Sequence, residues 1–161
     1  MRAALCFSFS LFALGCGTSS SNPPDSGPTV NCQNSPIAPG ADAQVTPYAS
    51  NLTAASADGT VQVVLVGSNP APPPVMVQTT WTVQINDGSG HPLPNATLSV
   101  PLPYMPFHGH YTDQQPAWQQ GSNGQWTVSN LYFFMPGVWQ VTFDVTNASS
   151  SESVLFHLCV D

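Results

Sequence analysis

Hydrophobic and polar residues alternate along most of the chain after position 60, which is the pattern of half-buried β-strands. In the clearest stretch, 75–85, valine, tryptophan and isoleucine at odd positions alternate mainly with glutamine and threonine at even positions. Shorter alternating stretches predict the other strands, which are 61–66, 96–102, 125–129, 139–145 and 154–160, with a weaker edge strand over 44–48.

No stretch carries the apolar stripe of an amphipathic helix, and the 17 prolines would interrupt most helices. Turn sequences such as 86–90 separate the predicted strands, and the proline-rich stretch 69–74 is a stiff connection between two of them. About seven short strands with turns between them predict an all-β fold, an immunoglobulin-like β-sandwich.

The small number of charged residues, and of basic residues in particular, excludes some classes of binding partner. Only 6% of the 161 residues are charged, and Arg2 is the only lysine or arginine, against eight acidic residues. Nucleic acid binding needs a cationic surface, so the composition argues against a nucleic acid partner. It argues equally against electrostatic docking on anionic lipid.

The first 16 residues resemble a lipoprotein signal peptide. Arg2 precedes an apolar run over 3–14, which as a helix spans only about 18 Å and is too short for a bilayer core of about 30 Å. The run ends at Ala13-Leu14-Gly15-Cys16, which resembles a lipobox whose cysteine is lipidated. The alternative is ordinary secretion with Cys16 as a spare thiol.

These features divide the chain into three parts. Residues 1–16 are the predicted signal peptide and lipobox, 17–31 a flexible tether rich in serine and proline, and 32–161 the folded sandwich. The chain is therefore expected to be exported and lipid-anchored, in the periplasm or on the cell surface of a bacterium.

The cysteines fit this division. Of the four, Cys6 would leave with the signal peptide and Cys16 would carry the lipid, so Cys32 and Cys159 remain to form a disulfide in an oxidising compartment. Closing a loop of this length stabilises by about 4–5 kcal/mol in the chain-entropy model. The alternative makes one of the two a thiolate ligand of a metal.

A cluster of potential metal ligands lies in 101–111. His108 and His110 are two residues apart, a spacing that puts both imidazoles on one side of an extended segment, and Met105 precedes them at a Met-Pro step. A thioether and two imidazoles suit copper. The alternative is a proline-rich loop whose histidines lie at the surface by chance.

Met135 repeats the Met-Pro step at the start of a later predicted strand. Because strand ends of a sandwich gather at one pole, Met105, His108, His110 and Met135 are predicted to form one copper site of four ligands. The alternative for Met135 is a core residue that follows two phenylalanines. The aromatic residues expected to shield the site are Tyr104, Phe107, Tyr111, Phe134 and Trp139.

Over roughly residues 60–160 the chain resembles a YtkA-like/FixH-like domain. The resemblance is carried by Asp87-Gly88, Pro92-Leu93, Asn95-Ala96, Met105-Pro106-x-His108-Gly109-His110, Gly124-x-Trp126 and Phe134-Met135-Pro136-Gly137-Val138-Trp139. Such domains are small exported or membrane-tethered β-sandwiches, often near copper-handling proteins. The resemblance implies a copper-binding accessory role outside the cytoplasm, with a protein that donates or receives copper as partner.

Two other functions remain open. A zinc site would replace the thioethers by Asp113 and keep His108 and His110, since a carboxylate with imidazoles suits zinc. A metal-free immunoglobulin-like adhesion or interaction module would use none of these residues.

The sequence contains no catalytic motif of a hydrolase, nucleotide-binding enzyme or metalloprotease, so we do not expect an enzyme. Cys159 with His157 is a fragment of a blue-copper ligand set, but the cysteine is already assigned to the disulfide. His91 is expected to be exposed in a turn, and His157 to be a surface residue or a distant fifth ligand.

Overall fold

The computed structural model describes residues 46–148 and 150–161, and in this part of the chain all regular structure is β-strand. The strands are β1 (Thr46–Pro47), β2 (Leu52–Ala55), β3 (Val61–Asn69), β4 (Gln78–Asp87), β5 (Thr97–Ser99), β6 (Tyr104–Met105), β7 (His110–Tyr111), β8 (Ala117–Gln120), β9 (Gln125–Tyr132), β10 (Gly137–Thr146) and β11 (Ser151–Val160). No helix long and apolar enough to cross a membrane occurs in these residues. The predicted signal peptide, the tether and Cys32 lie outside them.

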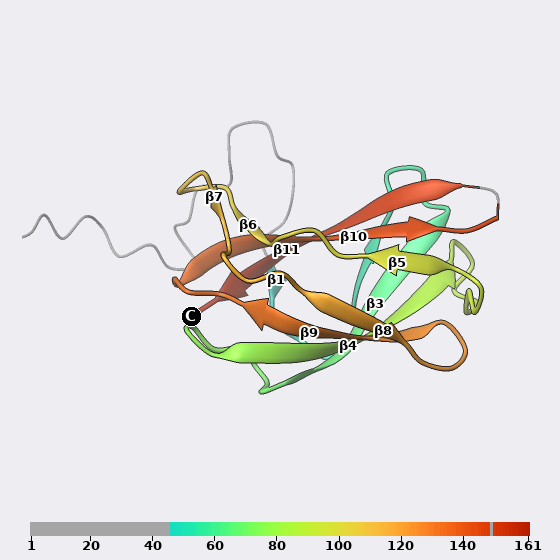
Figure 1. Cartoon of the computed structure of the whole chain (residues 1–161). Helices are drawn as coiled ribbons and strands as arrows, with labels where there is room; N and C mark the ends of the chain where they lie inside the picture. The colour runs from blue at the N-terminus through green and yellow to red at the C-terminus, as the bar shows by residue number, and fades with distance from the viewer. Residues whose placement is uncertain (1–45, 149) are drawn as a thin grey trace, which may run out of the picture.

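The strands form two sheets that pack against each other (Figure 1). One sheet has the order β1-β11-β10-β6-β7, with β5 also paired to β10, and the other has the order β2-β3-β4-β9-β8. All neighbours are antiparallel except β1, which pairs parallel with β11. The predicted all-β sandwich is confirmed, and its immunoglobulin-like character stays a prediction.

The core lies between the sheets and consists of the residues that the alternation assigns to one face. Trp81 of β4 crosses the space between the sheets, with its ring centroid 6.4 Å from that of Phe143 on β10. The other fully buried residues of the predicted strands include Val61, Val63, Val83, Ile85, Trp139, Val141, Val145, Val154 and Leu158. The predicted apolar faces of β10 and β11, and that of β4 from Thr79 onward, are therefore correct.

The strand boundaries differ from the prediction where tertiary contacts intervene. The strand predicted over 75–85 begins only at Gln78, because Met76 has a positive φ of 61° and its amide donates to the carbonyl of Phe133 at 2.8 Å. Val77 is consequently 46% exposed instead of facing the core.

The sequence pattern also missed the edge strands β2 and β8. All four residues of β8 are exposed, so no apolar face marks this strand in the sequence. Together with the two-residue strands β6 and β7, these edge strands raise the number above the seven that were expected.

The loops gather at the two ends of the sandwich. We call the end formed by 70–77, 104–111 and 133–137 the Met/His pole, and the end formed by 56–60, 87–95, 121–124 and 147–148 the opposite pole. The last strand runs to the Met/His pole, where Val160 pairs with Gly137 (Figure 1).

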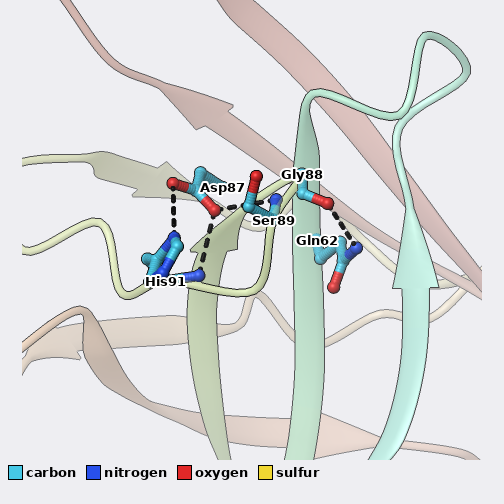
Figure 2. Close-up of polar contacts among 5 residues, drawn as sticks. All are labelled: Gln62, Asp87, Gly88, Ser89 and His91. Atoms are coloured by element: carbon cyan, nitrogen blue, oxygen red, sulfur yellow. Dashed lines mark hydrogen bonds and ion pairs between the residues drawn. The ribbon is translucent and has the colours of Figure 1, made fainter.

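At the opposite pole two turns touch through their backbones. Figure 2 shows the turn after β4, in which Asp87 accepts hydrogen bonds from the amides of Ser89 at 2.8 Å and His91 at 2.9 Å. The carbonyl of Gly88 accepts from the side-chain amide of Gln62 at 3.2 Å. Gly88 lies so close to the carbonyl oxygen of Gly59 that a β-carbon at position 88 would overlap it.

We therefore expect Gly88→Ala to lower the free energy of unfolding by about 1–3 kcal/mol, because backbone rather than a movable side chain opposes the new methyl group. Urea unfolding followed by tryptophan fluorescence measures the change. Gly67→Ala is the matched control, because nothing lies within 4 Å of a β-carbon there. Equal stability of the two variants would contradict the close packing of these turns.

Candidate metal site

The β6–β7 hairpin places the first group of predicted ligands. Met105 and His110 are direct partners in this two-stranded ladder, and the turn between them covers 106–109. Gly109 has a φ of 68°, which glycine adopts without strain, and its amide donates to the carbonyl of Met105 at 2.9 Å. Because direct cross-strand partners share a face, Met105 and His110 point to the same side of the sheet.

That side is the inner one. Gln140 of β10 pairs antiparallel with Tyr104, which places Trp139 beside Met105 on the inner face. Met105 is 0% exposed and belongs to the core, whereas His110 is half-buried at its edge. Met105 thus lies between a buried tryptophan and a half-buried histidine.

The two histidines lie together, but they do not do so as residues of one extended segment, which is what the sequence predicted. His108 is in the turn and exposed, while His110 is in β7. Their rings stack with centroids 5.6 Å apart. The ring of Phe107 meets His108 edge-on, with centroids 5.0 Å apart. The turn therefore produces the proximity that was expected from an extended segment.

The segment that precedes β10 brings Met135 to the same place. Phe134 stacks on His110 with centroids 5.0 Å apart, and Trp139 lies 6.0 Å from His110. The indole Nε1 of Trp139 donates to the carbonyl of Met135 at 3.0 Å. The two predicted segments, distant in the sequence, therefore meet at one pole.

Burial differs between the two methionines. Met135 is half-buried and packs against the core, whereas Met105 is fully buried within it. The sequence suggested a core residue as the alternative role of Met135. In the structure it is Met105 that is the core residue, whereas Met135 only packs against the core. The donors range from an exposed His108 to a buried Met105.

One atom of the cluster lacks the partner that its burial demands. The Nδ1 atom of His110 is buried and has no hydrogen-bond partner among the described residues. Leaving such a group unsatisfied costs about 1–3 kcal/mol. A buried imidazole nitrogen without a partner is a group that a water molecule or a metal ion would satisfy.

Only part of the predicted aromatic shield is present. Phe134, Trp139 and Phe107 contact the imidazoles, as described above. Tyr104 and Tyr111 instead pair with each other, with centroids 4.8 Å apart, and Tyr111 is 60% exposed. They belong to the outer face, since their neighbours Met105 and His110 point inward.

The zinc alternative finds no support in this geometry. Among the described residues, no three His, Cys, Asp or Glu side chains lie together so as to hold a metal ion. His108, His110 and Asp113 are therefore not assembled into a zinc site.

The remaining histidines lie elsewhere. His91 is 78% exposed at the opposite pole, as expected, with its Nδ1 3.5 Å from a carboxylate oxygen of Asp87. His157 is half-buried on β11, where its Nε2 lies 2.8 Å from the side-chain amide nitrogen of Gln140. Desolvation by this burial lowers the pKa of His157. His157 is a surface residue of the sandwich, one of the two roles expected for it.

Cys159 is buried, at 7% exposure, and is disulfide-bonded. Cys32 lies outside the described residues, so its pairing with Cys159 stays a prediction. β1 pairs with β11 at Cys159, which brings the start of the described chain to this cysteine.

The opposite pole carries an open cavity of about 620 Å³, whose lining includes Asp58, Asp87, Asn95 and Asn147. The carboxylates already serve the local turns. Asp58 accepts from the hydroxyl of Ser56 at 2.7 Å, and hydrogen bonds lower the pKa of both Asp58 and Asp87. These acids stabilise the turns and do not by themselves form a site.

Comparison of the chain with protein-family models, with curated proteins and with solved structures finds no match. The resemblance to YtkA-like/FixH-like domains therefore stays a prediction.

The lowered pKa of His157 predicts a pH-dependent contribution to stability. The folded state resists protonation, while the unfolded chain binds the proton near the ordinary value of about 6.5. Stability is therefore full above that pH and is lost as the pH falls toward the folded-state pKa. Between about pH 7.5 and 5.5 the melting temperature of the wild type should fall more than that of His157→Gln. If the melting temperatures of the two proteins fell equally between these pH values, the lowered pKa of His157 would be contradicted.

Proposed function

We propose that this chain binds one copper ion, as Cu(I) in preference to Cu(II), through Met105, His108, His110 and Met135. It holds or delivers the ion outside the cytoplasm. The observation that carries the proposal is the buried, unpartnered Nδ1 of His110, whose strand partner is Met105.

The donor set favours copper over other metals. Two thioethers and two imidazoles are soft and intermediate ligands, and thioethers favour Cu(I) in particular. Calcium and magnesium take oxygen ligands, and no carboxylate belongs to the proposed set. The proposal therefore depends on both sulfurs as well as on both rings.

The burial gradient supports a role in holding a transferable ion. His108 is exposed and is open to an incoming ion, while Met105 is covered completely. Phe134 and Trp139 pack on the ring of His110. They cover the side of the imidazole that faces the core and keep water away from it. An ion held between an exposed imidazole and a buried sulfur is both protected and within reach of a partner.

Export and anchoring complete the proposal. Lipidation at Cys16 and the tether over 17–31 would hold the sandwich near a membrane surface, where a copper-donating or copper-receiving protein can reach the Met/His pole. Neither nucleic acid nor a catalytic reaction enters this function.

A Cu(I) competition titration tests the site. His108→Ala/His110→Ala should weaken Cu(I) binding by more than the roughly 10–100-fold that loss of outer-shell groups costs, because two ligands disappear. Met105→Leu/Met135→Leu should weaken Cu(I) more than Cu(II), because only sulfur favours the softer ion. Acidification should weaken binding by the wild type, because protons compete for the imidazole nitrogens.

His91→Ala is the matched control, since it removes an exposed imidazole at the opposite pole and should leave the affinity unchanged. Methionine-to-leucine changes nearly conserve volume, so melting curves should show that the variants still fold. Wild-type affinity in both double variants would overturn the copper proposal and leave the metal-free interaction module.

The anchor has its own test. A fatty-acid probe fed to expressing bacteria should label the wild type but not Cys16→Ser, because Cys16 occupies the lipobox position. Equal labelling of both proteins would remove the lipid anchor and leave ordinary secretion.

A further inference from the structure

A third methionine lies at the Met/His pole. Met76 is in the connection between β3 and β4, and its amide donates to the carbonyl of Phe133 at 2.8 Å. Two residues of extended chain span at most about 7 Å, so this bond fixes the backbone of Met76 close to that of Met135. The sequence contains four methionines, and the three that follow Met1 all lie at this pole.

The conformation of Met76 is not explained by packing. Its φ of 61° lies in the left-handed region, which residues other than glycine seldom adopt. Its side chain is 68% exposed, so it gains little from burial. The fold thus holds an exposed thioether at the same pole as the potential copper ligands, with its backbone tied to that of Phe133.

Chemistry separates Met76 from the other exposed apolar residues of this pole. Val77 is 46% exposed and Phe107 is 44% exposed, but neither carries a donor atom for a metal. Methionine has three rotatable bonds and a polarizable sulfur, which allow it to follow a moving ion. Met76 therefore offers an exposed sulfur at this pole, whereas Met105 is fully buried.

We infer that Met76 is the solvent-facing thioether through which Cu(I) enters and leaves the site. This inference rests on the proposed function. A Cu–S bond forms to Met76 as a bond to the donor ligand breaks, and this Cu–S bond breaks in turn as bonds to His108 and the other ligands of the cluster form. The oxidation state stays Cu(I), and no proton moves, because a thioether carries none.

Methionine labelled with ¹³C at its methyl group tests the inference in the full mature protein, with Met76→Leu used to assign the signal. On titration with Cu(I), supplied as a bicinchoninate complex, the methyl signals of Met105 and Met135 should shift and saturate at one equivalent, and that of Met76 should shift by less, because the ion leaves Met76 once it reaches the cluster. Met76→Leu should keep the equilibrium affinity near that of the wild type. Its transfer of Cu(I) from the chelator should be about tenfold slower, which corresponds to about 1.4 kcal/mol on the barrier.

The matched control is Val77→Ala, which trims the same exposed connection without removing a donor and should transfer Cu(I) at the wild-type rate. Shifts at Met105 and Met135 without one at Met76, with an unchanged transfer rate in Met76→Leu, would overturn this inference and leave the proposed function standing. A shift at Met76 alone, or no shift at any methionine, would overturn both.

Discussion

The candidate site depends on the packing of one buried side chain, that of Trp139. Its ring contacts His110, Phe133 and Phe134, and its Nε1 holds the carbonyl of Met135. A buried aromatic side chain removes about 150–250 Å² of surface from water. This burial makes Trp139 the largest apolar surface on which the residues of this pole pack. Without this common surface the β6–β7 hairpin would be joined to β10 only through the backbone pairing of Tyr104 with Gln140, and the donors would be held less closely.

The sequence predicted the long strands that are buried on one face and missed β8, which is not. β10 and β11 alternate because one face of each packs into the core. β8 lies at a sheet edge with all its residues exposed, so nothing selects an alternating pattern there. The opposite error occurs at Val77, which continues an alternation although a hydrogen bond from Met76 turns the chain away.

The potential ligands of the candidate site could be chosen by residue type, but their surroundings could not be predicted. The sequence identified His108 and His110 as neighbours, although a turn rather than a strand brings them together. It could not show that Met105 is the buried methionine, because burial depends on the pairing of β6 with β10. The unpartnered Nδ1 of His110 and the place of Met76 follow from contacts between distant segments, which leave no local pattern.

The meeting of the last strand with the Met/His pole has a practical consequence. Val160 is paired with Gly137, two residues after Met135, so whatever is fused behind Asp161 emerges at the Met/His pole (Figure 1). A polyhistidine purification tag at that end would place a competing set of imidazoles next to His108 and His110. Metal-binding measurements on this protein are therefore meaningful only with the C-terminal end left bare or with the tag removed.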